Sequence, residues 1–158
     1  MQFKIRHLFS AFAAVAVAVF CLASPAGAWS SAEEGAVSIH ATSGYSGSVP
    51  AVQVDSAGNI YACGYFRTGN GTADVDPNPA VTNNVNVDAM NSSVISKYSP
   101  SGNLLWYLVV ESATGEDRPT DCALNAAGTH LAVVGTFEGT MVFPGGASIA
   151  SAGEDDAY

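Results

Sequence analysis

Beyond residue 50, short apolar runs alternate with clusters of polar and turn-forming residues. The runs are rich in Val, Ile, Leu and aromatic residues, and none shows the 3.6-residue apolar period of an amphipathic helix. Seven Pro and 16 Gly, scattered over the chain, also oppose long helices. The pattern predicts an all-β protein with strands at 51–54, 60–66, 93–98, 104–110, 122–124 and 130–137.

Three of the gaps between these runs share one five-residue pattern: Asp55–Asn59, Ser99–Asn103 and Asn125–Thr129. Each begins with a short polar residue, which can accept hydrogen bonds within the turn, and carries Gly in fourth place. Glycine adopts the left-handed backbone conformation at little cost. The pattern therefore predicts three hairpins, each with a type I turn followed by a bulge.

The sequence around the first of these turns recurs 70 residues later. Val54–Phe66 aligns with Leu124–Phe137 with one inserted residue, and each copy continues to a Gly-Thr pair. The same alignment places Asp156–Tyr158 on Ser92–Val94. A unit of this length holds four or five short antiparallel strands, and tandem four-stranded units are typical of β-propeller blades.

The stretches VDSAGNIYACGYF, GTADVDPNP and SVISKYSPSGNLLW resemble the SBBP-type β-propeller repeats of secreted and cell-surface proteins. The resemblance covers one full unit, 51–110, and the first part of a second, 121–158. The second copy departs from the pattern at Asn125, at Thr129 and at the Pro-Gly-Gly of 144–146. The resemblance implies an all-β architecture of antiparallel, propeller-like blades, and it says almost nothing about activity.

We therefore expect a first propeller-type repeat over 51–120 and a second over 121–158 that stops inside a strand. A closed propeller needs about 4–8 blades, so the remaining blades are expected to be missing or supplied by a longer chain. The alternatives are a fragment of a longer gene product, a truncated product, and a short chain that assembles with copies of itself. In each case a strand edge would be left open to pairing.

The first 28 residues have the three parts of a secretory signal peptide. Lys4 and Arg6 precede an apolar run, 8–22, that is too short for a comfortable membrane span, and small residues then lead to a cleavage site after Ala28. An uncleaved anchor is the alternative. We expect a secreted or cell-surface protein whose mature chain has no stable membrane span and begins with a flexible segment, 29–50, rich in Gly, Ser and Ala.

The chain is acidic, with 5 Lys and Arg against 14 Asp and Glu and a net charge of −9. Removal of the signal peptide takes away Lys4 and Arg6 and leaves a net charge of −11. Nucleic-acid binding requires clustered Lys and Arg, so this balance argues against a nucleic-acid partner. It also disfavours docking on anionic membranes.

Two cysteines remain in the mature chain, Cys63 and Cys122. Export would place them in an oxidising compartment, where a disulfide could form between them. Such a bridge would close a loop of about 60 residues. The alternative is that both are small buried apolar residues, because each lies within an apolar alternating run.

Asp74, Asp76 and Asn78 place oxygen ligands at alternate positions, a pattern that suits Ca²⁺. The spacing is not that of an EF-hand, and the second repeat lacks these acids, so the alternative is a solvated loop at the edge of a blade. No other cofactor is expected. Asn70 and Asn91 satisfy the rule for N-glycosylation, which would apply in a eukaryotic host.

No convergent set of catalytic residues is visible in the sequence. The histidines of the mature chain, His40 and His130, have no metal-binding or catalytic spacing. Acidic pairs such as Glu116–Asp117 lie in turn-like sequence and are expected to be solubilising charges. The sequence leaves enzymatic activity open and favours a protein that is not an enzyme.

The aromatic pairs Trp106/Tyr107 and Tyr61/Tyr65 could stack on a sugar, although such residues more often fill the space between blades. We expect an exported, non-catalytic β-propeller-repeat scaffold for adhesion or for recognition of a protein or glycan ligand. The alternatives are a fragment of a propeller-fold hydrolase or lyase that acts on extracellular polysaccharide, and a Ca²⁺-dependent lectin-like module.

Overall fold

The computed structural model describes residues 39–41, 46–67, 71–87, 90–112 and 114–158. The predicted signal peptide, its cleavage site after Ala28, and Asn70 lie outside these residues. The described chain consists of strands, turns and loops, without a helix. The prediction of an all-β fold is confirmed.

All strand pairs in the described residues are antiparallel. Five strands contain the runs predicted from the sequence, and the sixth, predicted over 130–137, begins one residue later, at Leu131. The strands are β1 (His40–Ala41), β2 (Gly47–Val54), β3 (Ile60–Phe66), β4 (Gly71–Asp74), β5 (Asn84–Val87), β6 (Ser92–Tyr98), β7 (Leu104–Ser112), β8 (Arg118–Leu124), β9 (Leu131–Val142) and β10 (Ser148–Ala157).

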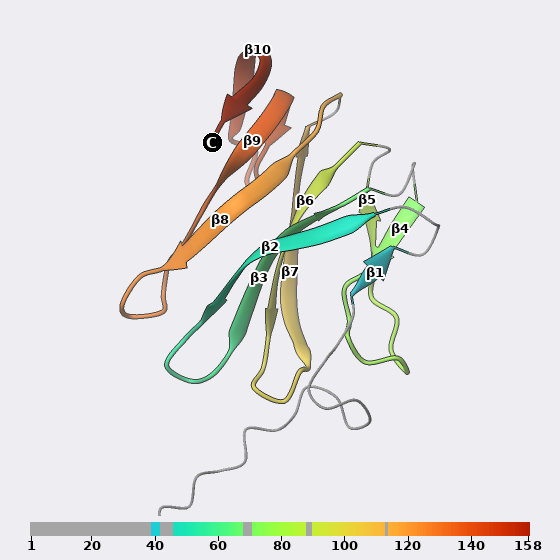
Figure 1. The fold of residues 1–158 in the computed structure, drawn as a ribbon, viewed down its shortest axis with the longest axis vertical. Coiled ribbons are helices and arrows are strands. Elements are labelled where there is room, and N and C mark those ends of the chain that lie inside the picture. The colour runs from blue at the N-terminus through green and yellow to red at the C-terminus, as the bar shows by residue number, and fades with distance from the viewer. Residues whose placement is uncertain (1–38, 42–45, 68–70, 88–89, 113) are drawn as a thin grey trace, which may run out of the picture.

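The described strands form a seven-stranded sheet and a three-stranded sheet. In the larger sheet β2, β3, β6 and β7 are neighbours in that order. One edge of β9 pairs with β10, and the other pairs first with β8 and then with the end of β7. The sheet curls, so that β8 lies against β2 and β3 without pairing with either (Figure 1).

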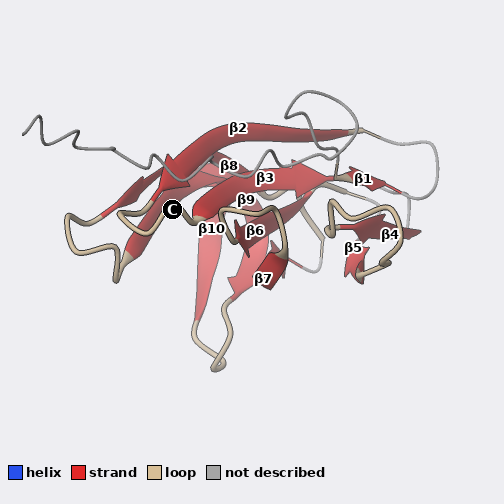
Figure 2. Ribbon diagram, turned by 90° about the horizontal axis from the view of Figure 1, so that it is seen from below, coloured by secondary structure: helices blue, strands red, loops and turns tan. Residues whose placement is uncertain are grey.

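The smaller sheet consists of β1, β4 and β5 and lies at one side of the larger sheet (Figure 2). Its β4–β5 hairpin is inserted between β3 and β6, and the sequence pattern did not predict it. The hairpin packs on Val94 and Phe66 of the larger sheet, and the Tyr98 hydroxyl donates a hydrogen bond to the Val75 carbonyl at 2.9 Å.

The main core lies between the two halves of the curled sheet. β2, β3, β6 and β7 contribute side chains from one half, and β8 and β9 contribute from the other. The pleat of each strand turns alternate residues toward this core and the residues between them toward the opposite face. The buried members of the cluster are Ala51, Cys63, Ile95, Val110, Cys122, Phe137 and Met141.

The three predicted hairpin turns are confirmed. In each of them the amide of the fourth residue, a Gly, donates to the carbonyl of the first at 2.9 Å. These glycines have φ angles of 81°, 84° and 66°, in the left-handed region that the prediction required; they are Gly58, Gly102 and Gly128.

The two hairpins that align in sequence share a second feature. Each has a bulge in its first strand, and a glycine in its second strand lies close to that bulge: Gly64 in β2–β3 and Gly135 in β8–β9. A Cβ on Gly64 would lie 2.4 Å from the Ser48 carbonyl oxygen, and one on Gly135 would lie 2.3 Å from that of Arg118. Both positions therefore require glycine because another backbone passes too close for a side chain.

Part of the segment 29–50, which was expected to be flexible, forms strands in both sheets. β2 begins at Gly47, and β1 lies at His40–Ala41. The small and polar residues of 47–50 enter the ladder because their backbone amides and carbonyls face β3, whatever their side chains.

Candidate functional site

The pairing of three strands brings Tyr61, Lys97 and Trp106 side by side. Lys97 is opposite Tyr61 in the β3–β6 ladder and opposite Trp106 in the β6–β7 ladder. The Lys97 ammonium lies 4.6 Å from the centre of the Tyr61 ring. The Tyr61 and Trp106 rings meet edge to face, with their centres 6.0 Å apart.

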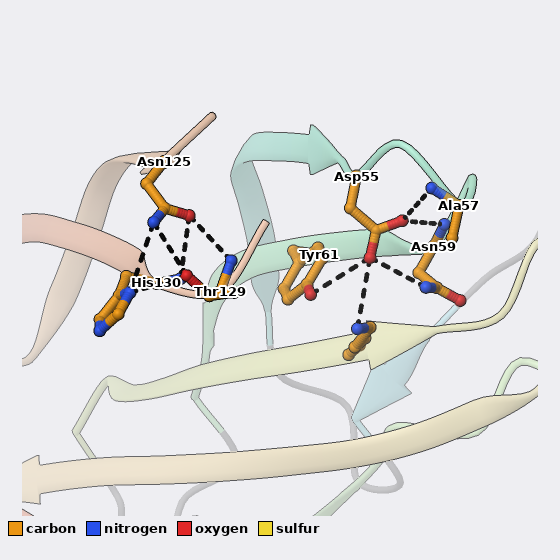
Figure 3. Close-up of polar contacts among 8 residues, drawn as sticks. Asp55, Ala57, Asn59, Tyr61, Asn125, Thr129 and His130 are labelled. Atoms are coloured by element: carbon orange, nitrogen blue, oxygen red, sulfur yellow. Dashed lines mark hydrogen bonds and ion pairs between the residues drawn. The ribbon is translucent and has the colours of Figure 1, made fainter. Parts of the chain in front are cut away.

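The Asp55 carboxylate connects Tyr61 and Lys97 to the Asp55–Asn59 turn (Figure 3). One carboxylate oxygen accepts the amides of Ala57 and Asn59 at 3.0 and 2.9 Å, as the turn chemistry predicts. The other oxygen accepts from the Asn59 side chain at 2.9 Å and the Tyr61 hydroxyl at 3.4 Å. It also lies 3.3 Å from the Lys97 ammonium.

These contacts shift the protonation equilibria of both charged partners. The hydrogen bond from Asn59, helped by the Lys97 ammonium, lowers the pKa of Asp55 to about 2. The hydrogen bond to Tyr61, followed by that to Asp55, raises the pKa of Lys97. Both side chains are therefore charged at neutral pH, and their charges are fixed in position.

The Asn125–Thr129 turn, between β8 and β9, carries a different polar set (Figure 3). The Asn125 side-chain oxygen accepts the amides of Thr129 and His130 at 2.8 and 3.1 Å. The Thr129 hydroxyl oxygen lies 2.9 Å from His130 Nδ1. This turn keeps the acceptor geometry of Asp55 and lacks its charge.

A groove of about 630 Å³ lies between β3, β6 and β7 on one side and the Asn125–Thr129 turn with the start of β9 on the other. This volume falls within the range of ligand-binding sites, about 300–1,000 Å³. Strands of both halves of the sheet contribute to its walls. The residues that line the groove include Tyr61, Ile95, Lys97, Trp106, Leu108, His130, Leu131, Val133 and Tyr158.

The groove is lined by both aliphatic and polar side chains. Ile95, Leu108 and Val133 supply apolar surface, and Lys97 and His130 are polar lining residues from different halves of the sheet. Trp106 is 41% exposed, a large exposed fraction for a side chain that is held by its neighbours on the sheet. An apolar surface with a few placed polar groups suits binding of a ligand.

The aromatic pairs expected from the sequence are regrouped in the structure. Trp106 and Tyr107 are neighbours along β7, so they face opposite sides of the sheet, and only Trp106 lines the groove. Tyr61 partners Trp106, while Tyr65 lies beneath the Arg118 guanidinium at 5.7 Å. The signal for this grouping was the turn pattern at Ser99–Asn103, because the turn fixes which residues of β6 and β7 are opposite each other.

Cys63 and Cys122 meet in the main core, although they belong to different halves of the sheet. Both are free thiols and buried, with exposed fractions of 0% and 3%. Burial, together with interaction with Cys122, raises the pKa of the Cys63 thiol, and burial raises that of Cys122. The two thiols are close enough to interact, and the bridge stays a prediction.

The Asp74–Asn78 stretch is solvated only at its end: Asn78 is exposed, whereas the two aspartates are buried. Asp74 and Asp76 are 7% and 9% exposed. Asp74 accepts the amides of Asp76 and Asn83 at 3.0 Å, and the Asn83 side-chain amide donates to Asp76 at 2.6 Å. Among the described residues no group of three or more His, Cys, Asp or Glu side chains could hold a metal, and the Ca²⁺ site stays a prediction.

Two other sequence expectations change with burial. Asn91 is only 3% exposed, so its side chain cannot carry a glycan in this fold. Asp117, expected to be a solubilising charge, is fully buried and accepts hydrogen bonds from the Ser112 hydroxyl. His130 is exposed at the rim of the groove, and nothing is described of the His40 side chain.

Comparison with known proteins finds no matching family model, curated protein or solved structure. Nothing in the described part of the chain forms a helix that is long and apolar enough to cross a membrane.

Proposed function

We propose that the chain is an exported, non-catalytic scaffold of propeller-type repeats that binds a ligand or partner in the groove between its two repeats. The observation that carries this proposal is the exposed Trp106 ring beside the fixed Lys97–Asp55 pair, in a groove that aliphatic side chains also line. Trp and Tyr are among the side chains that most often dominate the binding energy once a partner covers them.

The shared architecture of the two aligned hairpins supports the repeat interpretation. Both have the same turn, a bulge in the first strand, and a glycine against that bulge. The pairing of Gly135 with Tyr158 matches that of Gly64 with Val94, which agrees with the sequence alignment. Resemblance to SBBP-type repeats remains part of the proposal, together with export and the cell-surface location.

The groove also supports binding over catalysis. Its titratable side chains in the described residues are Lys97, His130 and two tyrosines, and Lys97 is already paired with Asp55. General acid–base chemistry on a glycan would need two carboxyl groups facing the same cleft, and no carboxylate lines this groove in the described chain.

Array binding with two neighbouring variants tests the proposal. The secreted full chain is applied to glycan and peptide arrays, beside Trp106→Ala and Tyr107→Ala. The two side chains are similarly exposed, at 41% and 44%, but only Trp106 lines the groove. We expect Trp106→Ala to weaken binding by about 30-fold, the loss typical of a central aromatic residue, and Tyr107→Ala to leave it unchanged. Equal effects of both variants, or no binding by the parent chain, would contradict the proposal.

A further inference from the structure

We infer that the chain forms a weak dimer, in which β7 of one copy pairs antiparallel with β7 of a second copy across a two-fold axis. This inference goes beyond the proposed binding function, because it concerns association of the chain with itself. It begins from an unequal use of the two edges of β7. One edge pairs with β6 along most of the strand, from Leu104 to Val110.

The other edge of β7 is paired only at the end of the strand. Glu111 and Ser112 lie opposite Val142 and Met141 of β9. The chain then runs on through β8, β9 and β10, and no strand of the described residues pairs with 104–110 on this side. Alternate residues of 104–110 therefore direct backbone amides and carbonyls away from β6 without a partner strand.

Strands at other borders of the two sheets carry features that hinder pairing with a new strand. β2 contains Pro50 and a bulge, β8 contains Pro119 and a bulge, and β10 contains an irregular stretch with Glu154 and Asp155. In the smaller sheet, the border strands β1 and β5 have only 2 and 4 residues. Proline, bulges, charges and short length all protect a sheet edge from unwanted pairing.

β7 lacks most of this protection. Residues 104–110 read LLWYLVV, without a proline or a charged side chain. The single register shift of its ladder with β6 lies at the start of the strand, between Leu104 and Trp106. Leu105, Trp106 and Tyr107 are 51%, 41% and 44% exposed. A long apolar edge of this kind readily pairs with another strand.

The absence of charge on this edge argues for a second copy as the partner. A partner selected by electrostatic attraction would need opposite charges on the strand, and 104–110 offers none. Strand pairing instead needs an edge that is equally free of proline and charge, and β7 of another copy is such an edge. Because the same surface lies on both sides, the contact closes as a dimer and does not propagate into a filament.

The antiparallel pairing also matches apolar residues with apolar residues. If Tyr107 lies at the two-fold axis, it faces Tyr107 of the other copy, and Trp106 lies opposite Leu108. Aromatic and aliphatic pairs across antiparallel strands stabilise a sheet. The exposed patch is small beside the interface of a stable complex, so we expect a dissociation constant of about 10–100 μM.

Salt should strengthen this dimer. Each copy carries a net charge of −9 or, without the predicted signal peptide, −11, so two copies repel each other wherever they meet. Dissolved salt screens that repulsion and leaves a neutral strand contact intact, so the dissociation constant should fall by about 3-fold or more between about 0.05 and 0.5 M NaCl.

Sedimentation equilibrium of the full secreted chain, over about 2–500 μM, measures the association. The test variant is Leu105→Lys, which places a charge on the β7 edge. The matched control is Val52→Lys on β2, because Val52 is 52% exposed and its replacement changes the net charge by the same amount. Urea midpoints of both variants show that the folded state is retained.

We expect Leu105→Lys to weaken the dimer by at least about 10-fold and Val52→Lys to change it by less than about 2-fold. Hydrogen exchange of the parent chain supplies a readout that needs no variant. The amides within 104–110 that point away from β6 should exchange at least about 5-fold more slowly at high than at low protein concentration.

Four results would overturn the inference. They are a parent chain that sediments as a monomer at every concentration, equal weakening by the two variants, a dimer without protection of 104–110, and a dimer that loosens as salt is added. The last result would show that the copies meet through charged groups. The array test of the proposed function uses other probes, so that proposal stands or fails separately.

Discussion

At the scale of single residues, Asp55 and Asn125 show how one position can serve two purposes. Each caps its turn by accepting the backbone amides that follow it. Only Asp55 carries a charge, and only Asp55 reaches a lysine, Lys97. The first hairpin is therefore joined to β6 by an ion pair. Among the described residues, the Asn125–Thr129 turn has no such ion pair.

This difference predicts the pH dependence of an Asp55→Asn variant. The folded-state pKa of Asp55, about 2, is below its ordinary value of 3.8. A depressed carboxyl pKa contributes stability that is present above the unfolded pKa and is lost as the pH falls toward the folded pKa. The stability difference between the parent chain and Asp55→Asn should therefore be largest near pH 5–7 and shrink between about pH 4 and pH 2.

Urea unfolding midpoints at pH 6, 4 and 2 measure this difference. Asparagine keeps the turn hydrogen bonds, as Asn125 does in the turn between β8 and β9, so the variant should fold. A constant gap between the two proteins at every pH would show that the Asp55 charge does not contribute. The variant should also loosen the contact between Tyr61 and Lys97 in the groove. We expect this change to alter ligand binding near Trp106.

At the scale of the elements, the β2–β3 and β8–β9 hairpins share a bulge in the first strand and a glycine against it in the second. The bulge in β2 brings the Ser48 carbonyl over Gly64, and the bulge in β8 does the same for Arg118 and Gly135. The sequence pattern predicted the strands and turns but not these bulges. A bulge depends on how two strands are paired, and the alternation of one strand does not report it.

The close approach predicts that Gly64→Ala destabilises the protein. A Cβ at 2.4 Å from a carbonyl oxygen forces the β2–β3 ladder to shift, and overpacking of this kind costs about 1–3 kcal/mol or more. Gly153→Ala is the matched control, because no atom lies within 4 Å of a Cβ there. Urea unfolding of the two variants gives the comparison. A loss for Gly64→Ala as small as that for Gly153→Ala would show that the hairpin adjusts freely.

At the scale of the whole molecule, the main core holds the two halves of the curled sheet together. Cys63 of one half and Cys122 of the other lie in one buried cluster, so a bond between them would cross-link the two halves. Their raised pKa values keep both thiols protonated at neutral pH, and their burial excludes solvent reagents. A bridge is therefore expected to form during folding, before the core closes.

The chain secreted into an oxidising compartment should contain this disulfide. In its formation the two thiols lose two protons and two electrons, which a disulfide-bearing oxidant accepts by thiol–disulfide exchange. Labelling with a maleimide in denaturant without reductant should modify neither cysteine, and Cys63→Ser should leave Cys122 reactive. Reduction should lower the stability of the parent chain by about 2–4 kcal/mol. Two reactive thiols in the unreduced, secreted chain would refute the bridge.

The sequence by itself determined the all-β class, the position of most strands and the three glycine turns. These features follow from local rules: alternation of side chains along a strand, and the backbone freedom of one glycine. Only the tertiary structure decided which faces meet. It brought Tyr61 beside Trp106, buried Asp74, Asp117 and Asn91, and brought Cys63 to Cys122. Burial and strand order depend on the curl of the sheet, and the curl is set by packing between residues far apart in the sequence.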